Sequence, residues 1–232
     1  RCLGASQSRL LALYGTEFLL LGLGACAAGC AIGFAAHALI AQWIAVILQA
    51  QLTAADGLYN GQRWDEAIAA YRAILAKAPA LSVINLQIAA AYRNKKQFDT
   101  AIGVYTDILK ADPGNGRAKL GVAMANLEKG DLDAAEQTLE VAAQASGATR
   151  DVFYSLGDVK LAKSKTDEAV RAYTRASEAD PTWGKPVFAL GRIAMGRDDK
   201  AGATKYFEKV VDIDPLSAEA AQAKAALDQL EK

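Results

Sequence analysis

The chain has 232 residues, enough for one or two domains, and its 26 basic and 26 acidic side chains cancel at pH 7. Because no net charge is left to attract nucleic acid or an acidic membrane surface, the composition argues against both as electrostatic partners. The charges are nevertheless unevenly distributed, since residues 1–50 contain only Arg1, Arg9 and Glu17. The sequence therefore predicts an apolar N-terminal part and a soluble body.

Residues 1–17 are expected to form an amphipathic lead-in, and residues 18–48 an apolar helix. The 31 residues from Phe18 to Leu48 carry no formal charge, and a helix of ~20 apolar residues crosses a bilayer. Trp43 suits a membrane interface, and Arg1 and Arg9 mark a cytoplasmic side. We expect a single-pass protein of a bacterial cell membrane, with its body in the periplasm or otherwise outside the cytoplasm.

Other interpretations of the apolar segment remain open. Arg63 and Arg72 are basic residues on the other side of it, which favours the alternative of a cytoplasmic body. Leu23-Gly24-Ala25-Cys26 is similar to a lipoprotein signal, although Glu17 precedes it and the apolar run continues well past Cys26. A third interpretation is a buried pair of helices that packs on the body.

The first 50 residues also resemble an FtsX-type permease of ABC transporters. The resemblance rests on Arg1-Cys2-Leu3-Gly4-Ala5-Ser6-Gln7, on Glu17, and on the glycine-rich apolar sequence after it (Gly22, Gly24, Gly29 and Gly33). It implies a transmembrane helix that runs outward from the cytoplasm. It also implies an alternative function for the chain, as a fragment or fusion of a permease that carries repeats.

The body repeats every 34 residues. Segments such as Asp65-Glu66-Ala67-Ile68 align on an alanine that recurs as Ala67, Ala101, Ala135, Ala169 and Ala203. A large side chain follows each alanine by four residues, on the same helical face: Tyr71, Tyr105, Leu139, Tyr173 and Phe207. A small residue precedes it by twelve, where two helices must approach closely: Ala55, Ala89, Ala123, Gly157 and Gly191. A helix-ending residue follows it by twelve: Pro79, Pro113, Gly147, Pro181 and Pro215.

Each set of aligned residues at the 34-residue interval is called a column. These columns resemble the tetratricopeptide repeat (TPR) family over about residues 48–232. The resemblance implies an all-α fold, a right-handed superhelical solenoid of five TPR helix pairs over 49–215 and a C-terminal capping helix over 216–232. The expected repeats are about 48–81, 82–115, 116–149, 150–183 and 184–215. The third departs from the family pattern at Asn126 and Gly147, so we expect a looser join near Ser146 to Thr149.

The resemblance also implies a concave groove that receives a peptide or a helix of a partner protein. Its groove-facing columns fall on Asp56, Tyr59, Leu86, Arg93, Arg117, Leu120, Met124, Tyr154, Asp158, Phe188 and Arg192. Tyr154, Phe188, Arg192 and Met124 are of the types that anchor interfaces, whereas Leu86, Leu120 and Met124 could equally pack between repeats. The columns of the chaperone-tail clamp hold Leu52, Asp56, Gln87, Arg117 and Gly121, which do not form that clamp.

Residue types that support catalysis are scarce. The single histidine, His37, lies in the apolar run, and the spacing of Cys26 and Cys30 fits neither a haem site nor a redox pair. Gly114-Asn115-Gly116-Arg117 lacks the partners of a phosphate loop. We therefore expect no enzyme, no cofactor, no metal and no small-molecule substrate, and we predict a membrane-tethered scaffold that binds a protein partner in an envelope assembly.

Overall fold

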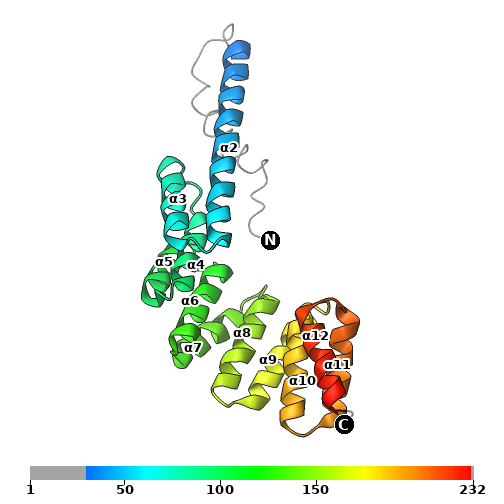
Figure 1. Ribbon diagram of the computed structural model, residues 1–232. Coiled ribbons are helices and arrows are strands. Elements are labelled where there is room, and N and C mark those ends of the chain that lie inside the picture. Colours follow the sequence, from blue (N-terminus) through cyan, green and yellow to red (C-terminus); the bar gives the residue numbers. More distant parts are fainter. Residues whose placement is uncertain (1–29, 231–232) are drawn as a thin grey trace. The chain divides into compact units, whose positions relative to one another are not determined.

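The computed structural model describes residues 30–230, and every regular element in that range is an α-helix (Figure 1). The predicted all-α fold is therefore confirmed for this range. The lead-in over 1–17, the lipoprotein-like segment and most of the permease-like segment lie outside the described residues. The helices are α2 (Cys30–Asn60), α3 (Trp64–Lys77), α4 (Ile84–Asn94), α5 (Phe98–Ala111), α6 (Gly116–Lys129), α7 (Leu132–Ala143), α8 (Arg150–Ala162), α9 (Thr166–Ala179), α10 (Gly184–Gly196), α11 (Lys200–Ile213) and α12 (Ala218–Leu230).

The chain divides into two compact units, residues 1–91 and 92–232. In the first unit, α3 packs on α2. In the second unit, each helix from α5 to α12 packs on the next one along the chain, and α12 also contacts α10. This consecutive packing of helix pairs is the arrangement that the repeats predict, with α12 covering the end of the last pair.

The turn inside each helix pair has the same backbone geometry. Left-handed φ angles of +60°, +61°, +92°, +59° and +59° occur at Gln62, Lys96, Gly130, Ser164 and Asp198, which are 34 residues apart. A residue with positive φ is uncommon outside glycine. Five such residues at one interval show that the helix pairs repeat in backbone geometry as well as in sequence.

The second helix of each pair ends where the sequence predicts. For example, α3 ends at Lys77 and α9 at Ala179, two residues before Pro79 and Pro181. Proline disfavours helical geometry in the residue before it and has no N–H to donate, so it fixes this end. Within the second unit, the side chain of Asp131 caps α7 by accepting a hydrogen bond from Ala134 N at 3.1 Å.

The small and large columns meet inside the helix pairs. A Cβ atom added at Gly157 in α8 would lie 2.5 Å from Cε1 of Tyr173 in α9. One added at Gly191 in α10 would lie 2.7 Å from Cε1 of Phe207 in α11. Both rings are almost fully buried, so the aromatic side chain occupies the space that the missing Cβ leaves. The predicted close approach of the two helices is therefore observed.

This contact predicts opposite effects for two Gly→Ala substitutions. Gly157→Ala is expected to lower the free energy of unfolding by about 1–3 kcal/mol, because the new methyl group overlaps the buried Tyr173 ring. Gly103→Ala, at an exposed position of α5 with nothing within 4 Å of the added Cβ, is expected to raise it by about 0.5–1 kcal/mol. Chemical denaturation of both variants measures the two signs. Equal effects would contradict the packing role of Gly157.

No helix boundary separates the apolar segment from the first repeat. We predicted an apolar helix over 18–48 and a repeat from 49 onward, whereas α2 continues unbroken from Cys30 to Asn60. The sequence contains neither glycine nor proline between Phe34 and Asp56, so nothing interrupts the helix there. The C-terminal part of α2 is the first helix of the first pair, where Asp56 accepts a 2.6 Å hydrogen bond from the Tyr71 hydroxyl of α3.

The join between the third and fourth repeats is closely packed. Gly147, with φ +96°, turns the chain between α7 and α8. Leu139 and Ala142 of α7 and Val152 and Leu156 of α8 belong to one buried apolar cluster. At the position where we expected a looser join, the two helices therefore share a buried core on either side of the turn.

Candidate partner-binding groove

A solvent-open cavity of about 710 Å³ lies in the second unit, between the first helices of the fourth and fifth repeats and the capping helix. Tyr154 and Asp158 of α8 line it, together with Phe188 and Arg192 of α10 and residues of α9 and α12. Helices of this kind hold side chains in fixed positions, which suits a binding site. We refer to this cavity as the groove.

Four of the residues predicted to face a groove lie together here: Tyr154, Asp158, Phe188 and Arg192. The Tyr154 ring is half-buried, with its centroid 5.4 Å from that of Tyr173 and 5.0 Å from that of Trp183. The Phe188 ring packs 5.6 Å from Phe207. Both rings are thus positioned by other aromatic side chains while part of each remains open to the cavity.

The other predicted residues of the second unit lie outside the groove. Arg93 Nη1 is 3.2 Å from the Met124 sulfur, and Arg93 Nε is 3.6 Å from Glu128 Oε1. Arg117 is exposed on α6, and Leu120 packs against the cluster that joins α7 and α8. Arg93 and Met124 therefore form a separate contact between helices.

In the first unit, two of the three residues predicted to face the groove, Asp56 and Tyr59, make contacts within their own repeat. Asp56 is engaged by Tyr71. Tyr59 packs edge-to-face on Trp64, with ring centroids 4.9 Å apart. Leu86 is half-buried on α4.

The polar residues of the groove that sequence reasoning missed include Lys185 on α10, and Glu219 and Gln222 on α12. Lys185 and Glu219 continue the column of Arg117 at the 34-residue step, and Gln222 continues the column of Tyr154 and Phe188. The same periodicity could have identified them if it had been carried into the capping helix.

Several charges in the groove are engaged by other protein groups. Asp158 accepts a 2.6 Å hydrogen bond from the Tyr173 hydroxyl. Burial raises the pKa of the Asp158 carboxyl, while the Tyr173 hydrogen bond and the Lys185 charge act in the opposite direction. Burial and the neighbouring Asp158 carboxylate raise the pKa of Tyr173. Lys185 Nζ is 4.0 Å from Glu219 Oε1, so it is also close to an anion.

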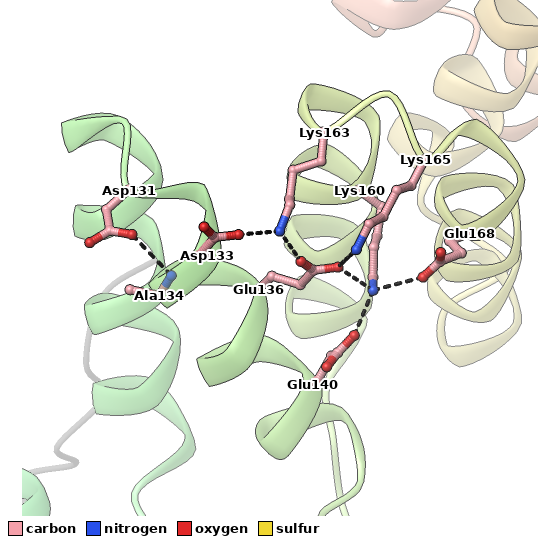
Figure 2. Close-up of polar contacts among 9 residues, drawn as sticks. All are labelled: Asp131, Asp133, Ala134, Glu136, Glu140, Lys160, Lys163, Lys165 and Glu168. Atoms are coloured by element: carbon pink, nitrogen blue, oxygen red, sulfur yellow. Dashed lines mark hydrogen bonds and ion pairs between the residues drawn. The ribbon is translucent and has the colours of Figure 1, made fainter.

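A second polar cluster, the ion network of α7, α8 and α9, is buried near the end of α8 (Figure 2). Glu136 accepts hydrogen bonds from Lys160, Lys163 and Lys165. These hydrogen bonds lower the pKa of Glu136 to about 2. Only 10% of the Glu136 side chain and 7% of the Lys160 side chain are exposed, so water contributes little to either charge.

Lys160 is the cation at the centre of this network. Its Nζ contacts Glu136 and Glu140 of α7 and, at 2.8 Å, Glu168 of α9. Burial lowers the pKa of Lys160, but the three carboxylates together raise it further, and the net shift is upward. The carboxylates of Glu136, Glu140 and Glu168 come within 4.8 Å of one another. Because the Lys160 ammonium already binds all three, the cluster joins helices and is not a candidate cation site.

The network extends an ion pair that recurs between neighbouring repeats. An aspartate in the first turn of one second helix pairs with a basic residue 30 positions later, at the C-terminal end of the next first helix. The recurring pairs are Asp99 with Lys129 at 2.6 Å, Asp133 with Lys163, and Asp167 with Arg197 at 2.6 Å. Most of these side chains are exposed, so each pair by itself contributes little to stability.

Family models described as tetratricopeptide repeat match residues 49–80, 93–152 and 154–218. These matches begin at residue 49 and give no support to the FtsX-type resemblance of the first 50 residues. No curated protein sequence matches the chain significantly.

Solved structures of TPR proteins share the fold. TTC0263, a thermophilic TPR protein from Thermus thermophilus, is 15% identical with a TM-score of 0.63, covering 79% of this chain and 98% of its own. MamA from Desulfovibrio magneticus RS-1 is 19% identical with a TM-score of 0.58, covering 74% and 97%. YrrB, a TPR protein with an unusual peptide-binding site, is 18% identical with a TM-score of 0.53, covering 75% and 90%. At these identities the similarity establishes the fold.

Proposed function

Since residues 49–80, 93–152 and 154–218 are tetratricopeptide repeats, we propose that this chain is a non-catalytic scaffold that binds a peptide or helix of a partner protein in the groove. The observation that carries the proposal is the convergence of Tyr154, Phe188 and Arg192 on one open cavity. Aromatic and arginine side chains dominate the binding energy of protein interfaces. The rings are held by Tyr173, Trp183 and Phe207, so little conformational entropy is lost when a ligand packs on them.

Alanine variants of the two groove aromatics test this proposal. Peptides are selected on the full-length, detergent-solubilised protein from a library of random 12-residue peptides, and their dissociation constants are measured. Tyr154→Ala and Phe188→Ala are each expected to weaken binding at least tenfold, the level of an interface anchor. The control is Val141→Ala, which removes an exposed apolar side chain from α7 outside the groove.

Because both rings also pack against neighbouring aromatics, circular dichroism must show unchanged helical content in each variant. Selected peptides that bind both variants as tightly as the parent protein would contradict the groove as the binding site. The same conclusion would follow if the library yielded no binders.

We further propose that the N-terminal part of α2 tethers the scaffold to a membrane. From Cys30 up to Asp56 the helix carries no formal charge. Leu39–Asn60 is the one stretch of the described residues that is long and apolar enough to span a bilayer, judged by length and composition alone. Exposed apolar side chains lie on one side of its N-terminal half: Leu39, Ile40, Trp43, Val46 and Ile47.

The C-terminal half of α2 packs on α3, so residues N-terminal to Gln51 supply the tether in this proposal. Lys77, at the end of α3, donates a 3.5 Å hydrogen bond to Gln51 Oε1 and places a charge beside the helix at that level. Because α2 has no break, the tether and the first repeat are one rigid rod in this proposal. Arg1 and Arg9 favour a body outside the cytoplasm, and a bacterial envelope assembly is the setting that fits it.

Fractionation of the full chain after expression in bacteria measures the tether. We expect the protein in the membrane fraction after an alkaline wash, released by detergent. Ile40→Lys/Ile47→Lys should shift most of it to the soluble fraction, because lysine is strongly disfavoured within the bilayer. Val141→Lys, on an exposed position of α7, should not. A parent protein that is soluble without detergent would refute the tether and leave the groove proposal intact.

A further inference from the structure

The charged residues that line the groove differ in whether the protein already neutralises them. Arg197 Nη2 is 2.6 Å from Asp167 Oδ1, and Lys185 Nζ is 4.0 Å from Glu219 Oε1. Asp158 accepts the Tyr173 hydrogen bond, and Lys185 is the cation that acts on its carboxyl. These charges are therefore accounted for within the protein.

Arg192 is the exception. Among the described residues, no carboxylate lies within ion-pair distance of its guanidinium, and the side chain is exposed on α10 toward the groove. Arg192 lines the same cavity as Tyr154 and Tyr173, and its positive charge opposes the rise in the pKa of both hydroxyls. A guanidinium offers five N–H donors in a planar arrangement that matches both oxygens of a carboxylate.

Apolar groups line the same cavity as this cation. Phe188 and Ala189 precede it on α10, Ile193 follows it, and Leu161 at the end of α8 lines the same cavity and is 41% exposed. An apolar side chain of a ligand that covers these groups would exclude water from Arg192. Excluding water strengthens an ion pair at that position.

We propose that the groove selects an acidic peptide segment, in which an aspartate or glutamate carboxylate pairs with Arg192 and a neighbouring apolar side chain packs on Phe188 and Leu161. This inference rests on the proposed function and specifies the chemistry of its ligand. The charge complementarity involves one cation, so the ligand needs one well-placed carboxylate and not a long acidic run.

Charge reversal at Arg192 tests the proposal. Random 12-residue peptides are selected in parallel on the full-length protein and on Arg192→Glu. Peptides selected by the parent protein are expected to be enriched in an Asp or Glu next to a large apolar residue. Those selected by Arg192→Glu should lose this enrichment and gain Lys or Arg at the same place. Because the Arg192 side chain is exposed and forms no ion pair within residues 30–230, the variant should keep the parent helical content and melting temperature.

A double-mutant cycle then isolates the pair. The best parent-selected peptide is synthesised with its acidic residue and with the matching Asn or Gln. The amide peptide should bind the parent protein at least tenfold more weakly, and the difference should disappear on Arg192→Gln. Arg171→Gln, at an exposed position of α9 outside the groove, is the matched control and should keep the full difference.

The outcomes separate this inference from the function on which it rests. If peptides bind and Phe188→Ala weakens them, but acidic residues are not enriched and Arg192→Gln leaves the amide penalty unchanged, the acidic specificity is wrong and the groove stands. If no peptide binds, or binding is insensitive to Phe188→Ala, the groove itself is wrong.

Discussion

Lys160→Met is expected to lower the free energy of unfolding by about 3–5 kcal/mol, the cost of removing one partner from a buried ion pair. Methionine keeps the length and apolar stem of the side chain, so the substitution removes mainly the charge. Without the ammonium, the carboxylates of Glu136, Glu140 and Glu168 lie within 4.8 Å of one another and lose their common cation. Glu136 keeps Lys163 and Lys165, whereas Glu140 and Glu168 keep no partner from this network.

The matched control is Lys129→Met, which removes the lysine of an exposed pair between the second and third repeats. The Lys129 and Asp99 side chains are 44% and 81% exposed, and solvent screens such pairs, so they contribute little to stability. Urea denaturation of both variants measures the difference. A loss for Lys160→Met no greater than that of Lys129→Met would show that the network does not stabilise the fold.

The fold was predictable because each helix pair obeys the same local rules. The small residue, the large ring and the helix-ending residue recur at one interval, and each has a local physical reason, as the contact of Gly157 with Tyr173 illustrates. The continuity of α2 was harder to predict from the sequence. The family pattern marks where a repeat begins, whereas a helix ends only where its backbone is interrupted.

The ion network was missed although the columns carried its signal. Glu136 occupies a column otherwise filled by Ile68, Ile102, Val170 and Thr204, and Lys160 one otherwise filled by Leu58, Tyr92, Asn126 and Ala194. Opposite charges in two mostly apolar columns of neighbouring repeats indicate a buried pair, since neither charge would be tolerated there alone. In these two columns only Asn126 was identified as a departure from the family pattern, and its column contains Lys160.

The types of residue that line the groove were predictable, but which of the candidate residues lie together in it was not. A column identifies the residues that share one helix face, and each repeat supplies one candidate groove residue per column. Which candidates share a cavity depends on neighbours outside the column. Met124 contacts Arg93, and Asp56 is engaged by Tyr71, whereas Arg192 has no such partner among the described residues and remains open to the groove.

Glu136 also predicts how stability depends on pH. Its pKa is about 2 in the folded protein, against 4.5 for an unperturbed glutamate. A carboxyl with a depressed folded pKa adds stability that is fully present above the unfolded pKa and is lost as the pH falls through the folded pKa. The window of loss therefore extends from about pH 4.5 down to pH 2, and the contribution at neutral pH is about 3 kcal/mol.

Glu136→Gln isolates this contribution, because an amide cannot be protonated in that range and resembles the neutral acid in shape. The free energy of unfolding of the parent protein should exceed that of Glu136→Gln by about 3 kcal/mol at pH 7, and the gap should close as the pH falls from 4.5 to 2. Glu66→Gln, which removes an exposed carboxylate paired with Arg63, should give a far smaller pH-dependent gap, since solvent screens that pair. If the difference in free energy of unfolding between the parent protein and Glu136→Gln stayed constant across this range, the three lysines would not stabilise the ionised carboxylate. The stability of the join between the third and fourth repeats would then have to come from the apolar cluster around Leu139 and Leu156.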